Sequence, residues 1–319
     1  MRELTTTTIG SFPLPLGIKE FKRCVEVQVK VGVDYPALPQ LEDFCFMFLR
    51  DIAERGKGLE RRGEFFVLTG PIEPPREPSI IRDVALAVSV LKELGVHGNL
   101  KIQVTGPFTL SSIVKFVNKS AMSYPDVVEN FADAVAHILA TACSLDEVEV
   151  AFIDEPTVYY AAWQGYGDDL IIDLINRALK GISRDIERGI HICGDARGLS
   201  RITLNLDVDV IHHEVMGFPK NLEAYNASEL NAKQKILGIG VVTTKPIDST
   251  IKVESENEVE ELVRRALARY KRVVIAPDCG FRGLMEFFGS EEAFEVAYLK
   301  MRAMTSTIKK VKKEMGVIN

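Results

Sequence analysis

Residues 188–195 read Arg188-Gly-Ile-His-Ile-Cys-Gly-Asp195, and this stretch sets the pattern on which the fold depends. Its apolar body is typical of a short strand buried on both faces, and the Gly-Asp pair ends it in a turn. His191 and Cys193 are two residues apart, so both side chains leave the same face of the strand. They lie roughly 6–7 Å apart along it, at ~3.3 Å rise per residue. The same arrangement, a buried strand that ends in reactive side chains, recurs along the chain.

Strands of this kind alternate with stretches of helical periodicity over the whole sequence. The main strands are expected to begin near residues 5, 31, 100, 147, 188, 207, 235 and 272. Eight strand–helix units predict an α/β fold, a TIM (β/α)8 barrel, as a single domain over residues 1–319 with a small insertion near 57–80. An open doubly wound sheet is the alternative. It should carry a Gly-rich dinucleotide turn after its first strand, and Ile9-Gly-Ser-Phe-Pro13 is not one.

The composition is that of an ordinary soluble protein, with 46% hydrophobic and 26% charged residues. A net charge of −6 gives no general attraction to nucleic acid or to an anionic membrane, so neither is an expected partner. The N-terminus lacks the apolar run of a signal peptide, and no apolar run approaches the ~20 residues that span a bilayer. The five cysteines are odd in number and widely spread, which argues against a disulfide scaffold and predicts a cytoplasmic protein.

Polar and reactive residues gather where the expected strands end. These residues are Ser11, Gln40, Thr105, Asp154, Glu155, His191, Cys193, Glu214 and Cys279. Barrel enzymes build their active sites at the C-terminal ends of the strands. The sequence therefore predicts an active site on this rim.

Four of these residues form a candidate metal site: His191, Cys193, Glu214 and Cys279. One nitrogen, two thiolates and one carboxylate are a tetrahedral set that suits zinc. The three anionic ligands overbalance Zn²⁺ by one charge, so the ion is a poor activator of water. It suits the binding of a substrate thiol, which it would keep as a thiolate. The alternative is two free cysteines buried in the core.

Asp154 ends an apolar strand beside Glu155, and a carboxylate at that place can hold an ammonium group. The alternative role is that of a helix N-cap. His212 and His213 are rivals for the metal, but they are consecutive and face opposite sides of their strand. We expect both to be structural, with His212, on the face of Glu214, as a possible supporting neighbour of the metal ligands.

Six matches to one enzyme family run from end to end of the chain: TTTIGSFP at 6–13, TGP at 105–107, IDEP at 153–156, HICGD at 191–195, the Glu of DVDVIHHE at 207–214 and PDCG at 277–280. The last four together are specific, because they occur in the right order and spacing. The chain resembles the catalytic, C-terminal half of cobalamin-independent methionine synthase, and most of all the short archaeal form that consists of that half alone. The resemblance implies a zinc-bearing TIM barrel that methylates the sulfur of homocysteine.

The resemblance also implies residue roles. The zinc ligands would be His191, Cys193, Glu214 and Cys279. The substrate amino acid would be bound through its carboxylate by Ile9, Gly10 and Ser11, and through its amino group by Asp154, with Gln40 nearby.

The chain departs from the bacterial enzymes at several places. Gln40 replaces an acidic residue, and it can hydrogen-bond an ammonium group but cannot neutralise it. Ile113 is the residue nearest to the place of the folate-stacking Trp, and Thr244 and Lys245 stand where a proton-donating His is found. The half that helps to hold polyglutamyl folate has no counterpart. The expected methyl donor is therefore a methyl-corrinoid, carried by a corrinoid protein, or a methyl-pterin.

The function predicted from the sequence is a zinc-dependent thiol S-methyltransferase of methionine biosynthesis that acts on homocysteine. One alternative is a barrel lyase resembling uroporphyrinogen decarboxylase, which needs basic side chains for many carboxylates and no zinc. The other is a non-catalytic protein that binds a thiol or a corrinoid.

Overall fold

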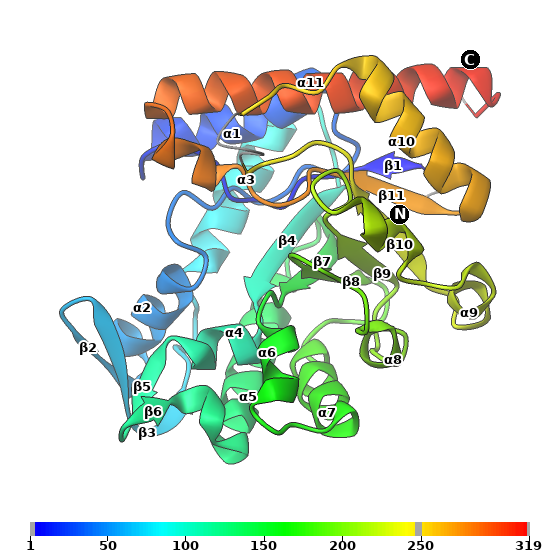
Figure 1. Ribbon diagram of the computed structural model, residues 1–319. Helices are drawn as coiled ribbons and strands as arrows, with labels where there is room; N and C mark the ends of the chain where they lie inside the picture. Colours follow the sequence, from blue (N-terminus) through cyan, green and yellow to red (C-terminus); the bar gives the residue numbers. More distant parts are fainter. Residues whose placement is uncertain (1–3, 246–250, 318–319) are drawn as a thin grey trace.

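The computed structural model describes residues 4–245 and 251–317. Seven parallel strands form one curled sheet in the order β1-β11-β10-β9-β8-β7-β4 (Figure 1). Their bounds are β1 (Thr5–Thr6), β4 (Leu100–Thr105), β7 (Val148–Asp154), β8 (Glu187–Ile192), β9 (Val210–His213), β10 (Ile236–Gly240) and β11 (Val273–Ala276). From β4 to β11 each strand of this sheet lies beside the next one along the chain, and β1 lies beside β11, as in a TIM-like barrel. This arrangement confirms the predicted fold class.

The remaining gap of the barrel, between β1 and β4, is closed by residues 35–40. Isolated parallel bridges join Tyr35 to Thr7 on one side and Ala37 to Lys101 on the other. The prediction of a regular strand beginning near residue 31 was wrong in detail, because this segment contains two prolines. Proline has no backbone N–H, so a continuous ladder of hydrogen bonds cannot form there.

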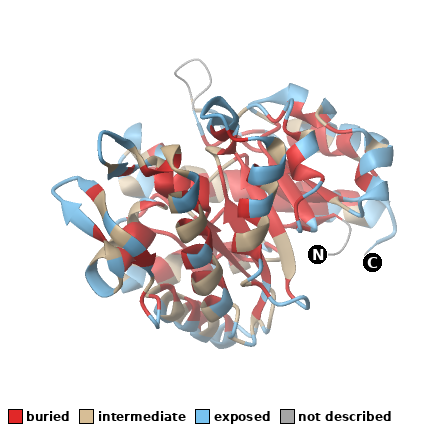
Figure 2. Cartoon of the chain, turned by 90° about the horizontal axis from the view of Figure 1, so that it is seen from below, coloured by how far each residue is buried: buried red, intermediate tan, exposed pale blue. Residues whose placement is uncertain are grey.

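Helices cover the outside of the sheet (Figures 1 and 2). The longer ones are α1 (Ile18–Val31), α2 (Phe46–Arg55), α3 (Ile80–Glu93), α5 (Pro125–Ala142), α7 (Asp168–Leu179), α10 (Glu256–Arg269) and α11 (Ser290–Glu314). The short ones are α4 (Pro107–Ser112), α6 (Val158–Trp163), α8 (Ser200–Thr203) and α9 (Ala227–Ala232), with 3₁₀ turns η1 (Ala121–Ser123), η2 (Pro219–Glu223) and η3 (Arg282–Glu286). All six residues of β4 and all four of β9 and β11 are buried, as expected for strands covered on both faces.

The insertion expected near residues 57–80 is a β-hairpin, β2 (Lys57–Arg62) and β3 (Phe65–Glu73). It pairs with a second hairpin, β5 (Val114–Phe116) and β6 (Lys119–Ser120), which the sequence did not predict. The pairing joins segments almost fifty residues apart, with Phe66 opposite Val114. That residues 1–319 form a single domain stays a prediction.

Among the described residues, every helix is too short or too polar to cross a lipid bilayer.

Candidate metal and substrate site

Three of the expected metal ligands come together at the C-terminal rim of the barrel. His191 lies near the end of β8, Cys193 follows this strand, and Cys279 follows β11. The Nε2 of His191 is 3.1 Å from the Sγ of Cys193, which is 3.2 Å from the Sγ of Cys279. One ligand atom from each residue lies within 4.8 Å of the other two. We call these three residues the imidazole–thiol cluster.

The pKa values of the three groups in the cluster are shifted in different directions. The hydrogen bond between the two sulfurs, with further stabilisation from His191, holds the pKa of Cys279 well below its ordinary value despite burial. The same bond and burial raise the pKa of Cys193. Burial lowers the pKa of His191, but the bond to Cys279 and its negative charge outweigh burial, so the net shift is upward. These opposite shifts make Cys279 the more acidic of the two thiols.

The donor set fits zinc. One imidazole and two sulfurs are ligands that zinc prefers. Two sulfurs at ~2.3 Å from one tetrahedral ion lie about 3.8 Å apart, so the observed 3.2 Å requires only a small outward movement. His191 is almost completely buried, which would limit competition by water for a bound ion.

His212 supports the cluster from inside the barrel. Its Nδ1 lies 2.8 Å from the Nδ1 of His191, and burial holds the pKa of His212 far below its ordinary value. A neutral His212 can thus accept from the Nδ1–H of His191, which leaves Nε2 of His191 toward the sulfurs. His213 faces the other side, where its Nε2 lies 2.6 Å from the hydroxyl of Tyr225. The two histidines occupy opposite faces, as the sequence predicted.

The fourth expected ligand, Glu214, lies close enough to His191 and Cys193 for its charge to act on both, and its role as a metal ligand stays a prediction. Its buried carboxylate accepts a hydrogen bond of 2.6 Å from the Nζ of Lys245, and it is not one of the three residues that converge. Sequence reasoning noted Lys245 only as a replacement for a histidine and missed this contact. The position of Lys245 shortly after β10, the strand beside β9, is the signal in the sequence that could have revealed its contact with Glu214.

Asp154 ends β7 next to His191 of β8. The carboxylate is 4% exposed, and its Oδ1 has no hydrogen-bond partner among the described residues. Burial raises the pKa of Asp154 to about 6, although the nearby His191 and Lys101 oppose the shift. A buried carboxylate oxygen without a partner is costly unless a ligand satisfies it, so Asp154 suits the ammonium group of a substrate.

Glu155 has a different task from its neighbour. Its carboxylate accepts the backbone N–H groups of Phe108 and Thr109 at the start of α4, at 3.1 and 2.7 Å. A negative charge is favourable at a helix N-terminus. Gly106 allows this approach, because a Cβ at that position would lie 2.1 Å from a carboxylate oxygen of Glu155. Of the adjacent acids, Glu155 is the helix cap and Asp154 remains available for a ligand.

The predicted amino-acid-binding residues are only partly brought together. Ser11 packs against Gly280 and lines, with Cys279 and Lys245, a cavity of about 440 Å³. Gln40 pairs with Ser11 through an isolated parallel bridge, but its side chain lines a separate cavity of about 190 Å³, and its amide donates to the carbonyl of Gln103 at 3.4 Å.

Gly10 makes the turn between Ile9 and Ser11. It has a positive φ of 102°, and a Cβ there would lie 2.0 Å from the amide of Gln103. Ile9 is buried. The contacts of residues 9–11 and Gln40 to a substrate stay predictions.

Fold and site together define a class: an α/β barrel with a sulfur-rich group of side chains at its C-terminal rim that could hold a metal ion. The family model described as the catalytic domain of the cobalamin-independent synthases matches residues 73–297, which is more than half of the chain. The chain belongs to this family, the methionine synthase family of methyltransferases. The family description gives no support to the expected corrinoid protein as methyl carrier.

Individual relatives are similar in sequence to this chain over nearly its full length. The chain is 25% identical to a methionine synthase of Methanocaldococcus jannaschii, over 97% of this chain and 100% of the relative. It is 29% identical to one of Methanothermobacter marburgensis, over 95% and 92%. A B12-independent methionine synthase of Shewanella sp. W3-18-1, solved in complex with selenomethionine, has a TM-score of 0.75 at 17% identity and covers 99% of this chain and 100% of that one. This last likeness shows the fold.

Proposed function

We propose that this chain is a zinc-dependent methyltransferase that transfers a methyl group to the sulfur of homocysteine and so forms methionine. The observation that carries the proposal is the convergence of His191, Cys193 and Cys279 within 4.8 Å. On the same rim, one carboxylate oxygen of Asp154 has no hydrogen-bond partner in the described part of the chain. An amino acid with a thiol side chain has a sulfur that a metal ion at the cluster would bind and an ammonium group that Asp154 would bind. Membership of the methionine synthase family supports the same acceptor.

The residues of the chain would bind and orient the acceptor. Asp154 would hold its ammonium group, and Ser11, beside Cys279, would contact its carboxylate. His191, Cys193 and Cys279 would hold the zinc. When bound, zinc would keep the substrate sulfur as a thiolate near neutral pH.

The reaction is a single displacement. The substrate thiolate attacks the methyl carbon of the donor and a sulfur–carbon bond forms. The bond from that carbon to the donor nitrogen breaks, its electron pair stays on the nitrogen, and the nitrogen takes up a proton from solvent. Orientation of the two reactants supplies much of the rate enhancement in reactions of this kind.

We propose a methylated pterin as the donor. The family is cobalamin-independent by description, which favours a pterin over a corrinoid. The five free cysteines favour a reducing compartment, the cytoplasm, as the place of action.

A donor screen tests the proposal. Purified zinc-loaded protein is incubated with homocysteine and either 5-methyltetrahydrofolate, its archaeal pterin analogue or methylcobalamin, and methionine is measured. Methionine from a methyl-pterin is the expected result. Methionine from methylcobalamin alone would refute the pterin donor, and none from any donor would favour a non-catalytic thiol-binding protein.

A further inference from the structure

Lys101 is a charged residue inside the barrel that has no part in the function proposed above. It lies on β4 and is completely buried, and its Nζ donates to the backbone carbonyl of Thr8 at 2.7 Å. The same ammonium group lies over the ring of Phe152, with 4.5 Å between Nζ and the ring centroid. Burial lowers the pKa of Lys101 to about 8, and the charge of Asp154 opposes this shift, so the group is mostly protonated at pH 7.

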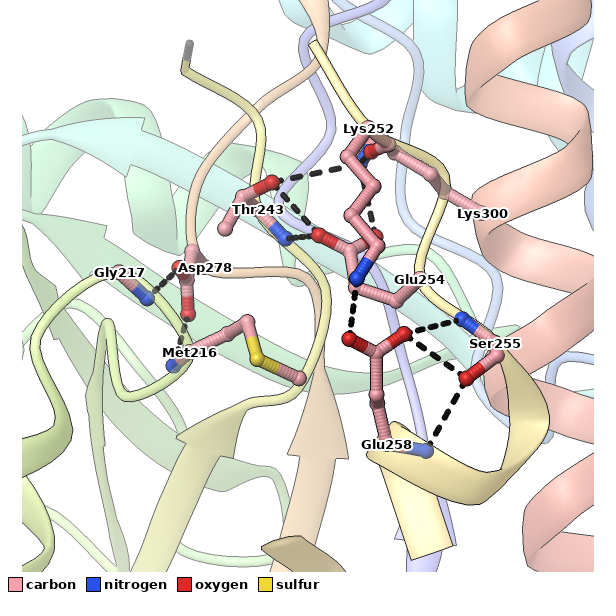
Figure 3. A network of polar contacts seen from close by, with 9 residues as sticks. All are labelled: Met216, Gly217, Thr243, Lys252, Glu254, Ser255, Glu258, Asp278 and Lys300. Carbon is pink, nitrogen blue, oxygen red and sulfur yellow. Dashed lines mark hydrogen bonds and ion pairs between the residues drawn. The ribbon is translucent and has the colours of Figure 1, made fainter. Parts of the chain in front are cut away.

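The surroundings of this ammonium group are unusual for a buried charge. A buried lysine normally has a carboxylate beside it, because an unpaired charge is costly away from water. Lys300 shows that arrangement, since its Nζ pairs with Glu254 at 2.7 Å (Figure 3). Lys101 forms no such ion pair within residues 4–245 and 251–317, and its contacts are a neutral carbonyl and an aromatic ring. A methionine of similar length would fill the same space without a buried charge, so packing alone does not account for Lys101.

Lys101 joins both segments at the gap of the barrel between β1 and β4. Its backbone N–H donates to the carbonyl of Pro36 at 2.9 Å, and its backbone carbonyl accepts from the N–H of Leu38 at 2.8 Å. Its side chain reaches the carbonyl of Thr8 on the other segment. Because Thr8 immediately precedes residues 9–11, the ammonium group holds the chain at the point where that loop begins.

The loop of residues 9–11 has donors to offer an anion. The backbone N–H groups of these three residues make no hydrogen bond to another described residue. Ser11 also lines the cavity of about 440 Å³ that Cys279 lines. Backbone N–H groups that follow one another and have no internal partner can bind an anion such as a carboxylate. The support that Lys101 gives to Thr8 therefore acts on a segment suited to the carboxylate of the acceptor.

We infer that Lys101 is a positioning residue for the carboxylate of the acceptor: its ammonium group fixes the carbonyl of Thr8 and so keeps the N–H groups of residues 9–11 in place. The inference rests on the proposed function, in which the acceptor is an amino acid with a thiol. The charge of Lys101 acts in the same sense. It is positive behind the loop that would bind the carboxylate, whereas Asp154 is negative where the ammonium group would bind. Together the two charges favour one orientation of a zwitterionic amino acid over the reverse.

The test compares two ligands that differ only in the carboxylate. The full chain is loaded with zinc, and isothermal titration calorimetry gives the Kd for homocysteine and for decarboxylated homocysteine, which retains the thiol and the ammonium group. The variants are Lys101→Met and Lys101→Gln. Lys235→Met is the matched control, because the Nζ of Lys235 also donates to backbone carbonyls, those of Leu206 and Val208, at 2.7 and 2.5 Å. Lys235 directly precedes β10, so it lies at the end of the barrel away from the C-terminal rim.

We expect Lys101→Met to raise the Kd for homocysteine about tenfold or more, because the donors for the carboxylate lose their support. The Kd for decarboxylated homocysteine should change by less than about twofold. Lys101→Gln should show the same selective loss, and Lys235→Met should bind both ligands as the parent chain does. In turnover the KM for homocysteine should rise while kcat changes by less than about threefold, because the carboxylate is bound alike before and during methyl transfer. Both Lys101 variants should fold, which thermal melting checks, because loss of this charge leaves no opposite charge without its ion-pair partner.

Two results would overturn the inference. The first is an equal rise of the Kd for both ligands in the Lys101 variants, which would show a general disturbance of the site and no link to the carboxylate. The second is an unchanged Kd for homocysteine in the folded variants. If the zinc-loaded parent chain itself does not bind homocysteine, the proposed function fails, and the inference fails with it.

Discussion

Replacement of Asp154 by Asn removes one negative charge from a buried position and leaves the shape of the side chain nearly unchanged. The carboxylate is 4% exposed, so solvent screens its interaction with a bound ammonium group only weakly. A hydrogen bond to a charged group contributes about 1.5–3 kcal/mol. At 1.4 kcal/mol per factor of ten, loss of this contact should raise the KM for homocysteine about 10- to 150-fold.

The fold of the variant should survive. One carboxylate oxygen of Asp154 has no partner among the described residues, and burial already raises its pKa to about 6. The native chain thus disfavours the ionised form, so a neutral Asn should leave the melting temperature unchanged or raise it.

Steady-state kinetics with varied homocysteine, together with zinc analysis and thermal melting, measure these effects. Asp51→Asn is the control, because it alters another buried acid, one that binds Arg55 and lies on α2. It should leave the KM unchanged. A KM for Asp154→Asn within a factor of about two of the parent value, which is below 0.5 kcal/mol, would refute the role of this residue.

Further predictions concern the metal and the stability of the fold. The purified chain should hold about one zinc ion. Metal analysis should find less zinc in Cys279→Ser, whereas Cys143→Ser, a control outside the cluster, should retain as much as the parent chain. Equal zinc retention in the two variants would contradict the proposed site. Ser255→Ala removes the reciprocal capping of α10 with Glu258 and should lower the free energy of unfolding by about 1 kcal/mol in urea titrations. Burial lowers the pKa of Lys101 to about 8, so the unfolded chain binds this proton more tightly and stability should rise with pH between about 8 and 10.5. Lys101→Met should flatten that rise in unfolding measurements, and an unchanged slope would show that Lys101 does not cause it.

The sequence by itself determined the succession of strands and helices and most of the candidate ligands. These features depend on local periodicity and on spacing of a few residues, and both act within one element. The two-residue separation of His191 and Cys193 is an example, because any strand places such side chains on one face. Placement of their partner Cys279 on the same rim followed from parallel strands whose ends meet at one side of a barrel.

Only the tertiary structure decided how distant groups pair. Residues 35–40 close the barrel through isolated bridges and not through a continuous ladder of hydrogen bonds. Strand β3 pairs with β5, which lies far from it in the sequence. Both pairings depend on which segments become neighbours in the folded chain. Tertiary contacts also distinguish two adjacent acids: backbone N–H groups at the start of α4 bind the carboxylate of Glu155, whereas one oxygen of Asp154 has no partner within residues 4–245 and 251–317.

The Glu214–Lys245 ion pair joins residues 31 positions apart. Residue types and spacing place both near the rim. Which anion the cation pairs with depends on the register of β9 and β10 and on the buried contacts behind them, and these arise only when the barrel is assembled.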